Sequence, residues 1–130
     1  MTLSVTFFLT ATFGFMLVAL SIYTSLRRRE LRVAHGDAGD EALKRRIRAH
    51  GNFIENAPFL LIVTGALEMA TASQATVALL ALAFLVARLI HVTGTLYGKD
   101  ATLRATAMVI QHAATVIACV TLMVIVITGR

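Results

Sequence analysis

Long apolar stretches constrain the fold of this chain more than any other feature of its sequence. The first runs from about Ser4 to Leu26 and contains 23 residues without a charged side chain. About 20 apolar residues are enough for a helix to cross the hydrocarbon core of a bilayer. No basic residue precedes the stretch, and Arg27, Arg28 and Arg29 follow it. We therefore interpret it as a retained membrane helix and not as a cleaved signal peptide.

The remaining sequence predicts three further helices, and with them an all-α, integral membrane four-helix bundle. The chain is 58% hydrophobic, whereas soluble domains are about 45–50% apolar. We expect a single membrane domain over residues 1–130, with transmembrane helices at about 4–26, 41–69, 75–97 and 101–128. Asp40 and Asp100 are suited to cap the second and fourth helices. Pro58 removes a backbone hydrogen bond inside the second helix and should kink it.

The basic residues indicate the orientation of this bundle. Eight of the twelve lie between positions 27 and 48, and Arg88, Lys99 and Arg104 lie at or near the turn between the third and fourth helices. Arg130 stands alone at the opposite end. By the positive-inside rule, both termini lie outside the cytoplasm. Membrane topology therefore explains the basic composition better than nucleic-acid binding does.

A polar stripe leads into the apolar part of the second helix. Arg48, Asn52 and Glu55 are spaced i, i+4 and i+7, which places all three on one helix face. Such groups are costly in lipid or in a protein core unless they pair or hold a ligand. The stripe therefore predicts a binding site or a paired contact between helices.

Further cations are expected at the same level of the membrane. Arg88 and His91 share one face of the third helix, and Arg104 begins the fourth. Arg88 lies about nine residues, or roughly 13 Å, before the end of its span, and an arginine at such a depth usually marks a site. A structural ion pair between Arg88 and Glu55 is the alternative reading. Shallower basic residues are expected to snorkel towards lipid headgroups.

Other kinds of site have little support in the sequence. His91 and His112 belong to no cluster of His, Cys and carboxylate residues with zinc-binding spacing, so no metal site is expected. Cys119 lies in an apolar run and suits a packing role. The sequence contains no phosphate-binding glycine motif and no serine nucleophile elbow.

The polar stripe also resembles a family motif. Arg48-x-x-x-Asn52-x-x-Glu55, followed by Pro58, looks like the signature of the MAPEG family, the membrane-associated proteins of eicosanoid and glutathione metabolism. The resemblance covers nearly the whole chain. What it implies is a homotrimer of four-helix protomers that binds glutathione between neighbouring subunits.

Later residues extend the resemblance to particular branches of the family. Arg88-x-x-His91 and Arg104 resemble the prostaglandin-synthase branch in order and spacing. Segment 32–37, with the sequence Arg-Val-Ala-His-Gly-Asp, looks most like a bacterial, uncharacterised branch, which implies the inner membrane of a bacterium.

The resemblance implies a function as well as a fold. That function is a membrane-bound glutathione-dependent transferase or peroxidase, which activates the thiol of its co-substrate for attack on a lipophilic electrophile from the bilayer. Arg104 is the implied catalytic residue, because it helps to form the thiolate. The implied glutathione-binding residues are Arg28, Arg48, Asn52, Glu55, Arg88 and His91.

Three positions depart from the family pattern. Thr95 stands where a tyrosine is common, and Ala105 stands where the prostaglandin branch has a hydroxyl residue. Asn56 replaces the aromatic residue that often follows the motif glutamate. The alternative function is a non-catalytic membrane trimer that binds glutathione or another small anion.

Overall fold

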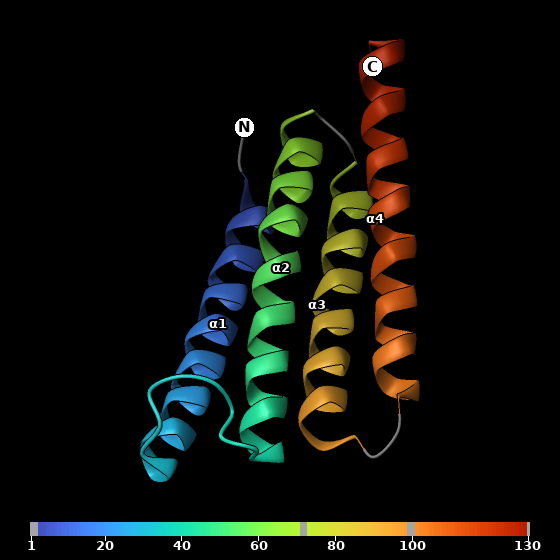
Figure 1. Ribbon diagram of the computed structural model, residues 1–130. Coiled ribbons are helices and arrows are strands. Elements are labelled where there is room, and N and C mark those ends of the chain that lie inside the picture. Colours follow the sequence, from blue (N-terminus) through green and yellow to red (C-terminus); the bar gives the residue numbers. More distant parts are fainter. Residues whose placement is uncertain (1–2, 71–72, 99–100, 130) are drawn as a thin grey trace.

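The computed structural model describes residues 3–70, 73–98 and 101–129, which form four long helices and, over those ranges, no strand (Figure 1). The helices run side by side, and the two ends of the chain lie at the same end of the bundle. The α1–α2 loop, the end of α3 and the start of α4 lie at the opposite end. The expected all-α bundle is confirmed. Its helices are α1 (Ser4–Leu31), α2 (Glu41–Met69), α3 (Gln74–Tyr97) and α4 (Thr102–Thr128).

The outer surface of the bundle is apolar. Phe15 on α1 and Ile127 on α4 are each 78% exposed, and many other large apolar side chains face outwards. Soluble monomers rarely expose apolar surface on this scale. In the described part of the chain, α1, α3 and α4 are long and apolar enough to cross a membrane. The protein is therefore an integral membrane protein, whereas a crossing by the more polar α2 remains a prediction.

Several buried threonine hydroxyl groups are satisfied within their own helix. Thr24, Thr64 and Thr95 each donate a hydrogen bond to the carbonyl oxygen four residues earlier, at 2.9, 2.7 and 2.8 Å. Lipid offers no partner to a hydroxyl group, so this local bond removes the cost of burying it. Polar side chains that form hydrogen bonds between helices therefore say more about a possible site than these threonines do.

Helices α1 and α2 form a hairpin with an aromatic contact in its core. The rings of Phe13 and Phe53 pack edge to face, with their centroids 5.4 Å apart. Leu9 and Leu60 are almost completely buried in the same cluster. Pro58 lies inside α2, and the helix continues on both sides of it.

Asp40 joins the two helices at the loop end of the hairpin and caps α2, as the sequence predicts. Its Oδ1 accepts a hydrogen bond from the backbone N–H of Leu43 at 2.7 Å. Arg27 donates to both carboxylate oxygens, at 3.2 and 2.6 Å. These bonds, those of Arg27 first, hold the pKa of Asp40 below its ordinary value. Asp100, the expected cap of α4, lies outside the described residues.

Glu68 fastens the other end of the same hairpin. Its carboxylate accepts hydrogen bonds from the backbone N–H groups of Val5 and Thr6, at 3.0 and 2.9 Å, and from the Thr6 hydroxyl at 2.7 Å. The first turn of a helix has backbone N–H groups without helical partners, and a carboxylate is favourable there. Glu68, which is 4% exposed, therefore acts as a cap for α1 from a distant part of the chain.

Small residues bring α3 and α4 close together. Ala87 and Ala107 are completely buried. A Cβ atom at Gly94 would lie 3.0 Å from Cβ of Leu103 and 3.3 Å from Cγ of Arg104. The missing side chain therefore lets the first turn of α4, which carries Arg104, pack against the last turns of α3.

Candidate functional site

A polar pocket of about 340 Å³ lies between α2, α3 and α4, at the end of the bundle that holds the α1–α2 loop. It brings together four of the seven site residues named from the sequence, namely Arg48, Asn52, His91 and Arg104. Its other lining residues are Thr95, Ala101, Ala105 and Met108.

Helical periodicity explains how these side chains converge. Each of the three helices contributes residues four positions apart, which lie on one helix face. Arg48 and Asn52 come from α2, and Arg48 is exposed at the pocket whereas Asn52 is buried. The corresponding residues are His91 and Thr95 on α3, and Arg104 and Met108 on α4.

Arg88 lies behind the pocket rather than in its lining. It is 1% exposed, and its Nη1 donates a hydrogen bond to Oδ1 of Asn52 at 2.8 Å. Its Nη2 lies 3.4 Å from Sδ of Met108, and its Nε has no partner. Both contacts are with residues of the lining, so Arg88 orients the side chain of Asn52 and adds a buried positive charge behind it.

His91 presents an unsatisfied nitrogen in this region. The side chain is 6% exposed, and its Nδ1 forms no hydrogen bond. Buried polar atoms without a partner are uncommon and call for an explanation. The charges of Arg88, Arg48 and Arg104 all act on the ring. The pocket is therefore electropositive, and it includes a polar group that a ligand could satisfy.

Two amide side chains extend the polar contacts between helices. Gln111 of α4, which is 2% exposed, donates from Nε2 to Oδ1 of Asn56 at 2.7 Å. Asn56 in turn donates from Nδ2 to the carbonyl oxygen of Asn52 at 2.8 Å. This contact holds α4 against α2 next to the pocket. The sequence singled out Asn56 only as a departure from the family and did not predict its partner.

Glu55 and Arg28 do not lie at this pocket. Glu55 is exposed, and the ion pairs among the described residues are Arg27–Glu30, Arg27–Asp40 and Lys44–Glu41. The alternative ion pair between Arg88 and Glu55 is therefore not formed, because Asn52 occupies that position. Arg28 donates to the carbonyl oxygen of Ala34 at 2.9 Å, a contact that braces the α1–α2 loop.

Metal-binding side chains do not cluster in the described part of the chain. No three His, Cys, Asp or Glu residues there are placed to hold a metal ion. Cys119 is partly buried and packs against the apolar core.

Comparison with known proteins agrees with the resemblance seen in the motif. The model of the MAPEG family matches residues 6–124 of the 130-residue chain, a range that includes the whole of α2 and α3. A search of curated proteins found no match.

Proposed function

Because the chain belongs to the MAPEG family, we propose that it is a membrane-bound transferase or peroxidase that uses glutathione as co-substrate. In this proposal, the protein activates the glutathione thiol for attack on a lipophilic electrophile that enters from the bilayer. The observation that carries the proposal is the pocket in which Arg48, Asn52, His91 and Arg104 meet.

The proposed role of Arg48 and Asn52 is to anchor glutathione. The peptide has two carboxylates, an ammonium group and a thiol. A guanidinium matches a carboxylate with two parallel hydrogen bonds, which suits Arg48 at the exposed side of the pocket. Arg88 supports this anchor from behind by fixing Oδ1 of Asn52. His91 is proposed to bind the peptide through its unsatisfied Nδ1.

The proposed role of Arg104 is to stabilise the thiolate. A free thiol has a pKa of about 8.5, so it is mostly protonated at neutral pH. Lowering that value by two units corresponds to about 2.7 kcal/mol of preference for the thiolate. Arg104 lies in the first turn of α4, where the helix dipole also favours an anion.

Glu55 and Arg28 enter the proposal through a homotrimer. Both lie outside the pocket of a single protomer. In the proposed trimer they contact glutathione bound between subunits, and the Glu55 carboxylate pairs with the ammonium group. A glutathione complex in which Glu55 contacts no ligand atom would remove this part of the proposal.

The proposed topology places the pocket at the cytoplasmic side. All four helices cross the inner membrane of a bacterium, and the basic α1–α2 loop faces the cytoplasm. The carboxyl end near Arg130 then lies outside. A reporter fused after Arg130 that is active only in the cytoplasm would reverse this orientation and move the pocket to the other face.

One observation favours a second candidate, a non-catalytic trimer that binds glutathione or another small anion. The lining of the pocket includes two arginines and no acidic residue. A simple anion could therefore be bound without any partner for an ammonium group.

A thiol-transfer assay on detergent-purified protein separates the two functions. The protein is given glutathione and a lipophilic electrophile such as chlorodinitrobenzene, and product formation is followed alongside calorimetry of glutathione binding. Turnover that depends on Arg104 supports the enzyme. Binding without turnover over a panel of electrophiles and hydroperoxides supports the second candidate, and absence of both removes glutathione from the proposal.

A further inference from the structure

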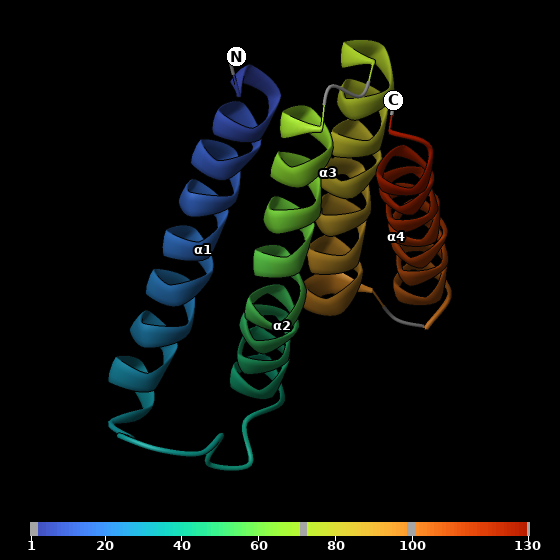
Figure 2. The ribbon, with the colours of Figure 1, turned by 90° about the horizontal axis from the view of Figure 1, so that it is seen from above.

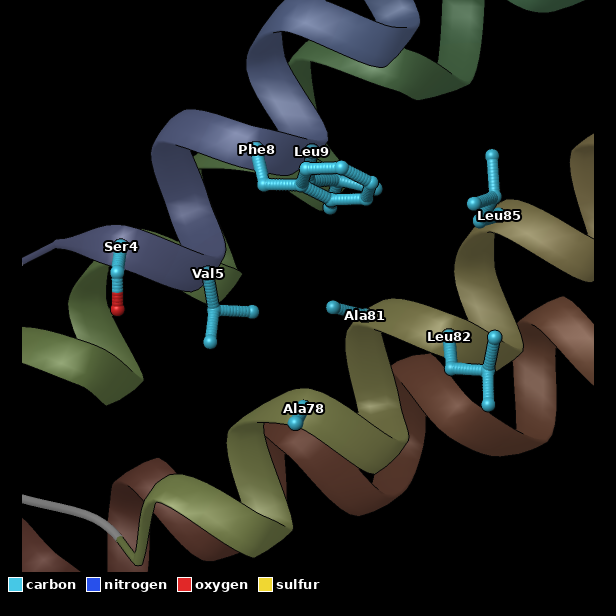
Figure 3. Close-up of a pocket in the computed structure, with 8 residues that line it drawn as sticks. All are labelled: Ser4, Val5, Phe8, Leu9, Ala78, Ala81, Leu82 and Leu85. Atoms are coloured by element: carbon cyan, nitrogen blue, oxygen red, sulfur yellow. The ribbon is translucent and has the colours of Figure 1, made fainter.

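Two apolar hollows lie on the face between α1 and α3, away from the polar pocket. The first, of about 310 Å³, is near the end of the bundle where the chain begins (Figure 3). In Figure 3, the small side chains of Ala78 and Ala81 on α3 leave an open space opposite Val5 and Phe8 of α1. This hollow has no charged residue in its lining.

The second hollow differs from the first because two tyrosines line one end of it. It measures about 380 Å³ and lies towards the α1–α2 loop, lined by Met16, Ala19 and Leu20 of α1 and by apolar residues of α3. Tyr23 and Tyr97 complete its lining. We call this hollow the tyrosine groove. Figure 2, the bundle seen from above, shows α1 and α3 on either side of α2.

A cation is fixed beside the two tyrosines. The guanidinium carbon of Arg46 lies 3.6 Å from the centroid of the Tyr23 ring. Its Nη1 donates to the carbonyl oxygen of Tyr23 at 2.8 Å, and the side chain of Tyr97 interacts with that of Tyr23. The groove therefore has an apolar body and, at one end, a guanidinium with two phenol groups.

Arg46 forms no direct ion pair with a described carboxylate, although its charge also acts on Asp40. None of the ion pairs formed within residues 3–70, 73–98 and 101–129 includes Arg46, whereas its neighbour Lys44 is paired with Glu41. Only one of its terminal nitrogens is used by the Tyr23 carbonyl. A guanidinium held in this way can offer its remaining N–H groups to a phosphate.

We propose that the tyrosine groove binds an anionic phospholipid. One acyl chain lies along the apolar part between α1 and α3, and the headgroup phosphate contacts Arg46 and the tyrosine hydroxyl groups. The apolar groove suits an acyl chain, and the guanidinium of Arg46 suits an anionic group. The arrangement therefore fits a molecule that has both an acyl chain and an anionic group. The first hollow, which has no cation, provides an internal comparison.

Native mass spectrometry of the delipidated protein tests the headgroup contact. Phosphatidylglycerol and phosphatidylcholine are titrated separately, and the wild-type protein should retain phosphatidylglycerol more tightly. Arg46→Gln should weaken phosphatidylglycerol binding about fivefold, the effect of one basic residue at an anionic surface, and should weaken phosphatidylcholine binding less, because the choline cation offsets the charge of that lipid's phosphate. Arg46→Lys should keep most of the preference. Arg45→Gln removes an adjacent exposed charge and should have no effect.

A second pair of variants tests the groove itself. Ala19→Phe fills the tyrosine groove and should weaken binding of both lipids, whereas Ala78→Phe fills the first hollow and should leave phosphatidylglycerol binding unchanged. If Arg46→Gln and Arg45→Gln had equal effects, nonspecific surface charge would explain the preference for phosphatidylglycerol, and the proposal would be overturned. An Ala19→Phe protein that keeps wild-type lipid affinity and melting temperature would also overturn it.

Discussion

Arg88 and Asn52, 36 residues apart in the chain and both buried, are joined by a hydrogen bond of 2.8 Å between Nη1 and Oδ1. The guanidinium has no carboxylate within ion-pair distance among the described residues. Its charge is therefore balanced chiefly by an amide dipole, and the lining of the pocket depends on that bond.

We expect Asn52→Ala to lower the free energy of unfolding by about 2–3 kcal/mol, because a buried charge loses its hydrogen-bond acceptor. Denaturation in mixed detergent measures the change. Asn52→Leu combined with Arg88→Met should recover much of the loss, because no unpaired charge then remains. If the Asn52→Ala protein were as stable as the wild type, the hydrogen bond between Arg88 and Asn52 would not contribute to the free energy of unfolding.

Arg104→Ala should abolish the bound thiolate while leaving glutathione affinity nearly intact. The guanidinium acts on the sulfur in our proposal, whereas other residues anchor the peptide. Ultraviolet absorbance of the thiolate, followed against pH in the presence of saturating glutathione, reports the ionisation. A mutant that still ionises bound glutathione at neutral pH would transfer the activating role to Arg88 or Arg28.

Arg48→Ala should weaken glutathione binding by about 1–3 kcal/mol, the range for losing a charged hydrogen-bond partner. Isothermal calorimetry on the purified protein measures the affinity. Arg45→Ala is the matched control, because Arg45 is an exposed arginine of the same helix outside the pocket lining. Unchanged affinity in Arg48→Ala and in Glu55→Gln would make the polar stripe a structural feature.

The Asp40 cap predicts an acid-sensitive contribution to stability. Its pKa is lowered in the folded protein, chiefly by hydrogen bonds from Arg27. The stabilisation is therefore complete above the ordinary carboxyl pKa of about 3.9 and is lost as the pH falls through the lower folded value. Asp40→Asn should lower the melting temperature at neutral pH and reduce its decline in acid. Glu41→Gln, which removes an exposed carboxylate paired only with Lys44, should alter both much less.

Native mass spectrometry in mild detergent should give the mass of three chains. The pocket of one protomer contains two arginines of the proposed site but neither Glu55 nor Arg28. A neighbouring subunit would complete it. A monomeric mass under several detergents that preserve glutathione binding would contradict the trimer.

Much of the site could be predicted because depth along a membrane helix can be read from the sequence. Arg48 and Arg104 lie near the starts of α2 and α4, whereas His91 lies near the end of α3, so a bundle with alternating helix directions brings all three to one level. Periodicity then adds Asn52 to the same face. The α2 helix likewise follows from the Asp40 cap and the apolar pattern that ends at Met69.

The partners across helices could not be predicted, because they depend on helix rotation and register. Asn52 and Glu55 are three residues apart, so a modest rotation of α2 decides which of them meets Arg88. The sequence offered Glu55 as a partner, and the structure has Asn52. Glu68 and Thr6 are 62 residues apart, and only the register of the α1–α2 hairpin brings them together.

The caps at both ends of the α1–α2 hairpin have a mechanical consequence. Glu68 ties α2 to the start of α1, and Asp40 ties the start of α2 to Arg27, so these two helices form a stiff frame. Near the pocket, Asn52 and Asn56 of this frame form side-chain hydrogen bonds with Arg88 of α3 and Gln111 of α4. In the proposed complex with glutathione, widening the pocket would require the α3–α4 pair to move against the frame. Such a movement would break these two hydrogen bonds of amide side chains and would leave the packed aromatic core of the α1–α2 hairpin intact.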